Sequence, residues 1–497
     1  MFEEIVTNDE VKFNDLEKKI FKFVCSFGCL ILKLMLEAYD RKLMNTRDTK
    51  KYRHKGLRGN TIKTIMGEVE YRRVMYEVEE DGIKKTVYLL DEKLRINVEG
   101  KVSENLIEKA IEIVPITDSY RKAETVIKET TNATLSFEAI RTLVVKVGDK
   151  ITKKEKEERK LMDKKQLVEG LKEITALFEE ADGIWINLQG KDREKRLERQ
   201  KKKCEKENKE FNPKMKVKTE LKLHVMYEGW KKDDPRHTLV NKQYMAGIMK
   251  PKEIKQLRDA RVYQQYKEES IKIRVTNGDG AKWTKGITVS GGFYQKDQFH
   301  IMQEIVRDVP KEYRNIIKEL VNTKQYDKIQ AAIESLKYEF GGEYTAVKKL
   351  NRLQSYLSSG LERYQDEVEV PKAPKGVEYR NMGTQESQIF SKLKKRFCSG
   401  RKAFSEHGAN ALAKVCVLNE RFSIDELETP IAIDTRVEEW IKEIEENVKR
   451  NYRKPIINRR EKAQYNLREG KIEKFPSLVE LLKIKAYSEL NISPCSN

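Results

Sequence analysis

The sequence predicts an α+β chain of several domains, in which a region of helix and β-ribbon precedes a mixed α/β core with an all-helical insertion. Alternating apolar and polar residues, the period of half-buried strands, recur mid-chain at 184–189, 220–230 and 271–275. Apolar residues at three- and four-residue steps, the period of amphipathic helices, fill 1–48 and most of 299–366. Because domains hold roughly 100–200 residues each, a chain of 497 residues allows two to four of them.

The composition favours a polyanionic partner. Lys and Arg number 101 against 81 Asp and Glu, a formal net charge of +20. Phosphate contacts by Lys and Arg supply most of the non-specific affinity for nucleic acid. No apolar run reaches the length of about 20 residues that crosses a bilayer, and the best candidate, 23–39, is interrupted by Lys33. We therefore expect a cytoplasmic protein that binds no membrane.

The cysteines are expected to be reduced structural thiols. They are scattered, and the sequence has neither CxxC pairs nor a Cys/His cluster with zinc-ligand spacing. The six are Cys25, Cys29, Cys204, Cys398, Cys416 and Cys495.

Residues 49–100 are expected to form a basic β-ribbon, with short strands at 61–64 and 69–76. The dipeptides MG at 66–67 and DG at 81–82 are turn signals. Basic and aromatic residues interleave here, so a face of cations could lie along a DNA backbone. A solvated edge strand protected by its charges would look similar. The candidates for DNA contact are Arg53, His54, Lys55, Arg58, Lys63, Arg72 and Arg73.

Residues 101–150 are expected to form three short helices that resemble a helix-turn-helix unit. Ser103, Ser119 and Ser136 each precede a helical stretch and are suitable N-caps. The second helix begins with Arg121 and Lys122, which are further candidates for DNA contact. A small helical bundle would have the same outline.

A charged helical linker, 151–178, leads to the first part of the core, 179–298. Strands are expected near 184–189, 220–230, 237–247 and 271–275, with a helix from Pro251 before the last of them. The charge run after the first strand is expected to be a mobile basic excursion, although a solvated face without a partner is as common.

The rest of the chain is expected to be helical. Residues 299–375 form the helical insertion, 376–420 return to the core with a helix that carries Glu386, and 421–497 are charged and without a motif. Cations that follow Glu386 could hold a DNA strand: Lys392, Lys394, Lys395 and Arg396.

Acids at strand ends are the strongest chemical signal. Asp182 stands where the first strand is expected to begin, and Asp279 follows the fourth strand in the stretch NGDG. In a ribonuclease-H-like fold these two strands lie side by side, and a later helix brings in Glu386. Three carboxylates at one point repel unless cations neutralise them, and oxygen ligands suit Mg²⁺ or Mn²⁺. Two such ions could activate and stabilise the oxygens of a phosphodiester, although each Asp alone could be a turn cap.

The chain resembles the ISLre-type insertion-sequence transposases, a bacterial DDE group related to the Mutator-like transposases. The stretches that carry the resemblance span about 51–404 in the expected order: YRHKGLRGNTIKTIMGEVEYRRVMY, EEADGIWINLQG, VTNGDGAKW, GGFYQKDQFHI and GTQESQIFSKLKKRF. It implies that Asp182, Asp279 and Glu386 bind two Mg²⁺ or Mn²⁺ ions. It also places His300 near the active site, where a structural histidine is the alternative, with Asp297 as a partner behind the ligands.

The resemblance implies a transposase in the bacterial cytoplasm, associated with the nucleoid. Such an enzyme binds double-stranded DNA at the terminal inverted repeats of its element, cuts there, and joins the free 3′-hydroxyl to target DNA as a homodimer or larger assembly. Glu378 and Glu343 are rivals of Glu386 for the third acid. A ribonuclease-H-like nuclease without strand transfer and a non-catalytic DNA-binding protein are the alternative functions.

Overall fold

The computed structural model describes residues 12–80, 82–96, 101–418, 422–434 and 446. Of the expected C-terminal helical region, only α18 (Ile424–Glu428) and its surroundings fall within these residues. The rest of the prediction for 421–497 lies outside the described residues.

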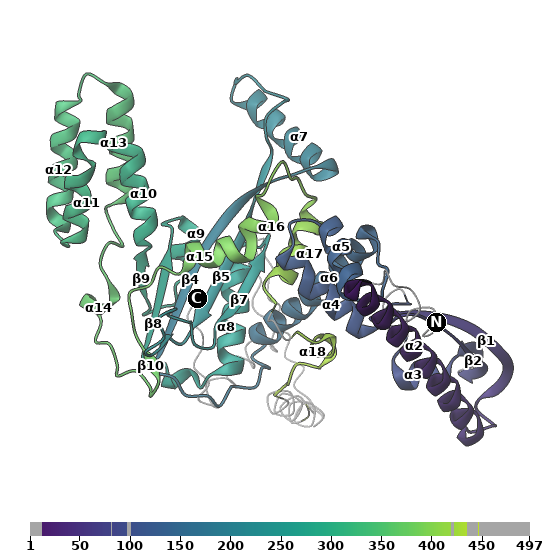
Figure 1. Cartoon of the computed structure of the whole chain (residues 1–497). Helices are drawn as coiled ribbons and strands as arrows, with labels where there is room; N and C mark the ends of the chain where they lie inside the picture. Colours follow the sequence, from purple (N-terminus) through teal and green to yellow (C-terminus); the bar gives the residue numbers. More distant parts are fainter. Residues whose placement is uncertain (1–11, 81, 97–100, 419–421, 435–445, 447–497) are drawn as a thin grey trace, which may run out of the picture.

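The N-terminal module packs one long helix against a twisted ribbon (Figure 1). Helix α2 (Phe13–Thr46) is followed by the antiparallel strands β1 (Arg53–Thr64), β2 (Gly67–Glu80) and β3 (Ile83–Val87), and by α3 (Leu89–Leu94). The expected ribbon is present, but its first two strands are longer than the sequence pattern indicated.

Three helices follow, as expected: α4 (Glu104–Ile116), α5 (Tyr120–Thr130) and α6 (Phe137–Asp163). Each predicted serine cap is confirmed, because its side chain accepts a hydrogen bond from a backbone N–H in the first turn. Helix α6 continues through much of the segment expected to be a separate linker. It packs on α8 (Pro251–Gln265) and α17 (Glu406–Cys416), so it belongs to the core.

The core is a five-stranded mixed sheet in the order β7-β5-β4-β8-β9. Strand β4 pairs antiparallel with β5, and β5 antiparallel with β7, whereas β4–β8 and β8–β9 are parallel. The strand bounds are β4 (Ala176–Asn187), β5 (Lys218–Tyr227), β7 (Gln243–Gly247), β8 (Ile273–Gly278) and β9 (Phe293–Lys296). Two short strands, β6 (Trp230–Lys231) and β10 (Val377–Glu378), pair separately.

Strand β4 begins earlier than expected, so Asp182 is its seventh residue and not its first. The sequence hides this start because Glu179 and Glu180 interrupt the apolar pattern, yet both side chains are fully buried. Glu179 faces α8 and accepts hydrogen bonds from Arg258 of α8 and Arg274 of β8. It also contacts His224 of β5. Burial opposes the charge on Glu179, but the two guanidinium groups hold its pKa well below its usual range.

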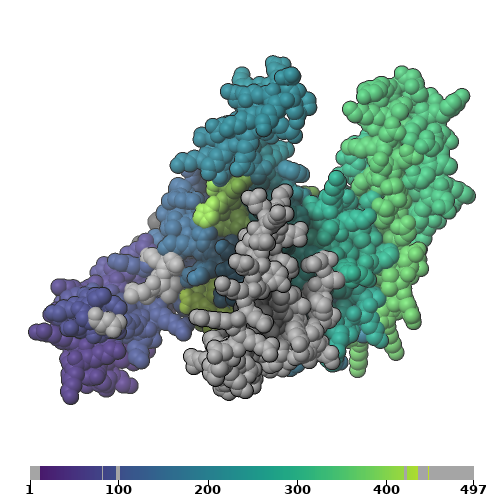
Figure 2. Space-filling model, turned by 180° about the vertical axis from the view of Figure 1, so that it is seen from behind, coloured from purple at the N-terminus to yellow at the C-terminus, as the bar shows by residue number. Residues whose placement is uncertain are grey.

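Two arms project from the core. One is α7 (Gly190–Lys206), which follows β4 and corresponds to the charge run expected to be a mobile excursion. The other is the helical insertion, formed by α10 (Gln298–Asp308), α11 (Arg314–Asn322), α12 (Tyr326–Glu339) and α13 (Tyr344–Tyr356) around their own apolar core. In the space-filling view the arms stand apart with a hollow between them (Figure 2).

The chain returns from the insertion through α14 (Tyr364–Glu367) to a second set of helices on the sheet. These are α15 (Gln385–Ile389), a π-helical turn (Phe390–Lys394) and α16 (Lys395–Phe397). They lie on the face of β4 opposite α8, beside α17 (Figure 1). Among the helices described, none combines the length and the apolar character needed to span a membrane.

Candidate metal centre

Asp182 lies where the two parallel strands β4 and β8 part. Their pairing ends with Ala181 opposite Gly278, so the next residues are Asp182 on β4 and Asp279 after β8. The prediction that these two strands are neighbours is confirmed. Asp182 remains paired with β5 and is buried, and its carboxylate accepts a hydrogen bond of 2.6 Å from the N–H of Gly183.

His300 reaches Asp182 from the first turn of α10. Asp297 is the N-cap of this helix and accepts a hydrogen bond from the His300 backbone N–H. Its Oδ2 also lies 3.2 Å from His300 Nδ1, and His300 Nε2 lies 3.8 Å from Asp182 Oδ2. With Nδ1–H donating to Asp297, the other ring nitrogen points toward Asp182. A carboxylate behind an imidazole is the usual arrangement at metal-ligating histidines.

Glu386 lies in the first turn of α15, and Glu180 holds this turn against the sheet. Glu180 projects from the same face of β4 as Asp182, two residues earlier, as the period of a strand requires. Its carboxylate accepts hydrogen bonds from the backbone N–H of Thr384 (3.2 Å) and of Gln385 (3.0 Å), and from the Thr384 hydroxyl (2.8 Å). A carboxylate on strand β4 therefore caps the helix that carries Glu386.

Glu180 also receives hydrogen bonds from the Tyr227 hydroxyl (2.6 Å) and the Asn277 side-chain amide (3.3 Å). The same amide donates to Asp297 at 3.0 Å. A buried polar network thus connects the cap of α15 to the cap of α10. It fixes the two helix starts that carry Glu386 and His300.

The structure brings Asp182, His300 and Glu386 together: one ligand atom from each lies within 4.8 Å of the other two. Glu386 Oε1 accepts a hydrogen bond of 2.6 Å from Lys394. The rivals lie elsewhere: Glu378 is in β10, paired with Arg380, and Glu343 is the N-cap of α13. Of the three acids considered for the third position, Glu386 is the one that joins the cluster.

Asp279 lies beside this cluster and is not one of its three members. Its Oδ1 accepts hydrogen bonds from the Ala281 N–H (2.9 Å) and the Thr284 hydroxyl (3.2 Å), so it closes its own loop. The Tyr356 hydroxyl, from the helical insertion, donates to the Asp279 carbonyl at 2.9 Å. The expected trio therefore differs from the observed one, in which a histidine stands nearest to the first Asp and the Glu.

Burial raises the pKa of Asp182 to about 7, although His300, the Gly183 N–H and Lys394 favour its ionised form; the charge of Asp279 adds to the rise. Burial disfavours the charged form of His300, but Asp297, Asp182 and Asp279 outweigh this effect and raise its pKa. Asp182 is thus a buried acid whose charge the protein compensates poorly, whereas Glu386 is partly exposed and paired with Lys394.

The donors present fit a divalent cation. Asp182 and Glu386 offer carboxylate oxygens, which suit Mg²⁺ and Mn²⁺, and the charge of Asp279 at the adjacent strand end acts on Asp182. The imidazole of His300 adds a nitrogen donor that was not expected of an oxygen-only site. Nitrogen donors suit transition metals better than Mg²⁺, so this set favours Mn²⁺ between the two ions considered.

Most basic residues expected to contact DNA are on the surface, but two are not. Arg73 is buried against Asp91, with its guanidinium 3.9 Å from the centre of the Tyr88 ring. Arg396 is buried over the Tyr120 ring and donates to the Asp118 carbonyl. Both fix the fold, and neither can reach DNA without leaving these partners.

The other candidates are exposed or partly exposed, some of them in ion pairs. Lys55 pairs with Glu77, Lys63 with Glu68 and Lys394 with Glu386. The remaining members of this group are Arg53, His54, Arg58, Arg72, Arg121, Lys122, Lys392 and Lys395.

Sequence reasoning missed Glu180. The signal for it was the pair of adjacent acids, Glu179 and Glu180, before Asp182. Because side chains alternate between the two faces of a strand, Glu180 lies on the same face as Asp182. Sequence reasoning also underestimated His300. The signal for it was the spacing of Asp297 and His300, which are the N-cap and the third residue of one helix.

Replacing Glu180 by Gln should loosen α15. The new NH₂ group would meet the N–H groups of Thr384 and Gln385, so we expect a loss of about 2–4 kcal/mol of unfolding free energy and faster hydrogen exchange of those two amides. The control is Tyr227→Phe, which removes one donor only and should cost about 1 kcal/mol. Equal losses in the two variants would show that Glu180 does not hold the helix.

Replacing Asp182 by Asn should stabilise the protein without added metal at pH 8. The folded-state pKa of about 7 lies above the ordinary value of 3.8, so ionising Asp182 costs stability, fully above pH 7 and less as the pH falls toward 4. Asn keeps an acceptor for Gly183 and carries no charge. We expect a gain of up to about 4 kcal/mol at pH 8 that shrinks to about a third of that value by pH 5, measured by chemical unfolding. A gain independent of pH would contradict this.

Comparison with known proteins places the chain in a family. A family model described as "Uncharacterised protein family (UPF0236)" matches residues 6–425. Among the curated relatives are UPF0236 proteins of Caldanaerobacter subterraneus subsp. tengcongensis. One is 23% identical over 377 residues, which are 73% of this chain and 70% of the relative. Another is 23% identical over 383 residues, which are 74% and 72%.

A solved structure, "Drosophila P element transposase strand transfer complex", is 9% identical and covers 71% of this chain and 90% of its own, with a TM-score of 0.19. A likeness at this level carries no argument about fold or function. The family match covers most of the chain, and the chain belongs to the UPF0236 family of uncharacterised proteins.

Proposed function

We propose that the protein is a DDE-type DNA transposase that cuts the ends of its own insertion element and joins them to target DNA. The observation that carries the proposal is the cluster of Asp182, His300 and Glu386 at the point where β4 and β8 part, with Asp279 at the adjacent strand end. The strand order supports it, because three antiparallel strands followed by two parallel ones is the arrangement expected of a ribonuclease-H-like core.

In this proposal Asp182 and Glu386, with Asp279 beside them, would hold one or two divalent cations. Bound there, such ions supply Lewis-acid activation of the attacking oxygen and charge stabilisation of the leaving oxygen of a phosphodiester. His300, held by Asp297, either adds a nitrogen ligand or accepts the proton of the attacking water. Glu180 acts indirectly, because it positions Glu386 and does not contact the substrate.

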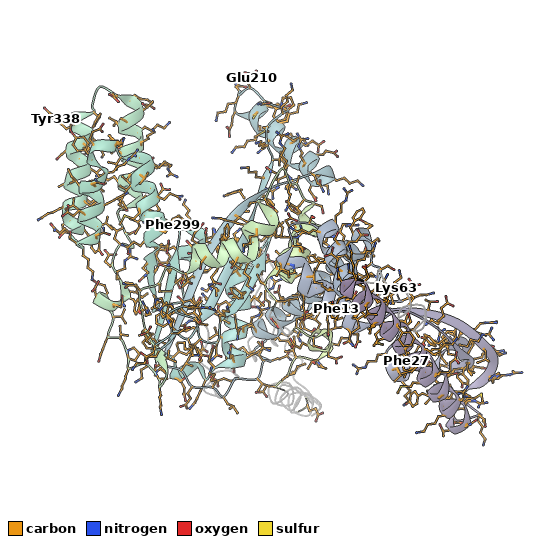
Figure 3. All side chains as sticks on the ribbon, in the orientation of Figure 1. Phe13, Phe27, Lys63, Glu210, Phe299 and Tyr338 are labelled. Atoms are coloured by element: carbon orange, nitrogen blue, oxygen red, sulfur yellow. The ribbon has the colours of Figure 1, made fainter. Side chains whose placement is uncertain are left out.

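The two arms support a DNA path across the site. Helix α7 follows β4, which carries Asp182, and α10 opens the insertion with His300, so the cluster lies between the roots of both arms (Figure 1). Glu210, beyond the end of α7, and Tyr338, in the insertion, lie toward the far ends of the arms (Figure 3). Helix α7 has nine basic and four acidic residues among its seventeen, and none is buried.

A helix that is polar all round has no core to join, so it is stabilised by a partner of opposite charge or by its own ion pairs. In α7, Arg196 fixes the helix to the core by pairing with Glu406. Farther along α7, Lys201, Lys202 and Lys203 are exposed, and Lys203 is in an exposed ion pair with Glu207. Phosphates passing through the hollow between the arms would meet these cations.

The relatives of this chain fit a mobile element. One name joins four locus labels and another joins eleven, all from one strain. A gene that a transposase copies around its genome would be found at several loci. Since two element ends must be joined, the proposal includes a homodimer or larger assembly on DNA, in the bacterial cytoplasm.

Metal-dependent nicking at the element boundary is the direct test. A labelled duplex carrying the DNA that flanks this gene should be cut to leave a 3′-hydroxyl with Mn²⁺ or Mg²⁺ and left intact with chelator. Asp182→Asn should lower the rate by about 1000-fold. The control is Asp149→Asn, an exposed acid of α6 that pairs with His407. Binding without cutting in either metal would leave a non-catalytic DNA-binding protein.

Neutralising the far half of α7 should weaken DNA binding in a salt-dependent way. The triple variant Lys201→Gln, Lys202→Gln, Lys203→Gln removes three cations, so the slope of log K against log salt should fall by about 2–3 for a non-specific duplex. The matched control neutralises three exposed lysines of α6: Lys153, Lys156 and Lys160. The same slope in both variants would place the DNA elsewhere.

A further inference from the structure

Helix α2 has two apolar faces, and its own fold uses only one of them. Cys25, Leu36 and Asp40 are buried where the helix lies on the ribbon, and the Asp40 carboxylate accepts a hydrogen bond from the Val74 N–H. On the other side, large apolar side chains meet solvent. Nine of them lie together, each more than 40% exposed, and we call them the outer face: Phe13, Ile20, Phe23, Val24, Phe27, Leu30, Ile31, Leu34 and Met35. Phe21, which is 47% exposed, lies beyond the edge of this face.

The outer face has the spacing of a helix-pairing seam. Phe13, Ile20, Phe27 and Leu34 recur every seven residues, and Val24 and Ile31 lie between them at four-residue steps. At 100° per residue, all nine side chains fall within an arc of about 140°, opposite the buried face. Phe23 and Phe27 stack on each other with ring centroids 6.4 Å apart. Phe13 and Phe27 mark this helix in Figure 3.

We propose that the outer face pairs with the outer face of a second copy of this chain. A helix that is apolar on both sides is ordinarily covered on both. A heptad repeat of apolar residues packs against a second helix. The same repeat on a second copy of α2 can pack against this one, as a two-fold interface requires.

The exposed apolar area of the outer face is large enough for a stable dimer. Large apolar side chains bury roughly 150–200 Å² each, so covering the exposed half of nine gives roughly 800 Å² per copy. That is the share of one partner in a specific interface of standard size.

Such pairing brings two ribbons onto one body, because each α2 carries the strands β1–β3 on its buried face. It does not depend on the metal centre, and the metal centre does not depend on it. The two proposals can therefore fail separately.

The test is the mass of the full chain in solution at micromolar concentration, by light scattering after size exclusion. The wild type should have twice the mass of 58.4 kDa. The variant Phe27→Glu, Leu34→Glu should be monomeric, with dimerisation weakened by about 100-fold or more. Because these side chains point away from the ribbon, the variant should keep the wild-type circular dichroism spectrum and Mn²⁺ affinity. Its unfolding midpoint should not rise with protein concentration as that of the wild-type dimer should.

The control is Leu171→Glu, Tyr338→Glu, which changes two apolar side chains that are each 93% exposed outside α2. It should remain dimeric. A monomeric wild type, a dimer that survives in the α2 variant, or equal dissociation of the control would each overturn the proposal. A monomeric wild type that binds phospholipid vesicles through this face would assign it to a lipid surface instead.

Discussion

The candidate site depends on how one buried carboxylate is satisfied. Glu180 is fully buried on β4, and a carboxylate there is tolerated only if donors surround it. Five hydrogen bonds meet it, and three of them come from Thr384 and Gln385, at the start of the helix that bears Glu386. About 200 residues of sequence separate Glu180 on β4 from Thr384 before α15, so this contact joins two distant parts of the chain. Two residues farther along β4, on the same face, Asp182 has no such shell.

Glu180 and Asp182 differ in how their buried charge is compensated, and this difference explains the character of the site. Five hydrogen bonds partly compensate the burial of Glu180, which still raises its pKa, and they hold structure; Asp182 receives one backbone N–H and faces His300 and Glu386. Burial raises the pKa of Asp182 to about 7, so the fold accommodates its charge poorly. Residues that cost stability in this way are typical of functional sites, where a ligand supplies the missing interaction.

The sequence predicted what depends on local pattern. The serine caps of three helices, the long N-terminal helix and the helical insertion follow from periodicity and capping residues. The adjacency of the strands bearing Asp182 and Asp279 was expected from the likeness to a ribonuclease-H-like fold. The sequence could not predict features that depend on partners distant in the chain. The start of β4 was hidden because its acids are paired with Arg258, Arg274 and the α15 turn, and Arg73 resembled a surface cation because Asp91 and Tyr88 enclose it only in the folded chain. The same limit applies to His300, which reaches Asp182 only through the geometry of a helix start.

The most direct test of the central claim needs no DNA. Mn²⁺ titrated into the full chain and followed by electron paramagnetic resonance reports bound ions, and spin-echo modulation reports whether an imidazole nitrogen is among their ligands. The account predicts saturable binding that is lost in Asp182→Asn and in Glu386→Gln, and a nitrogen signal that disappears in His300→Ala if the histidine is a ligand. Binding that is absent in the wild type, or unchanged in both acid variants, would contradict the account.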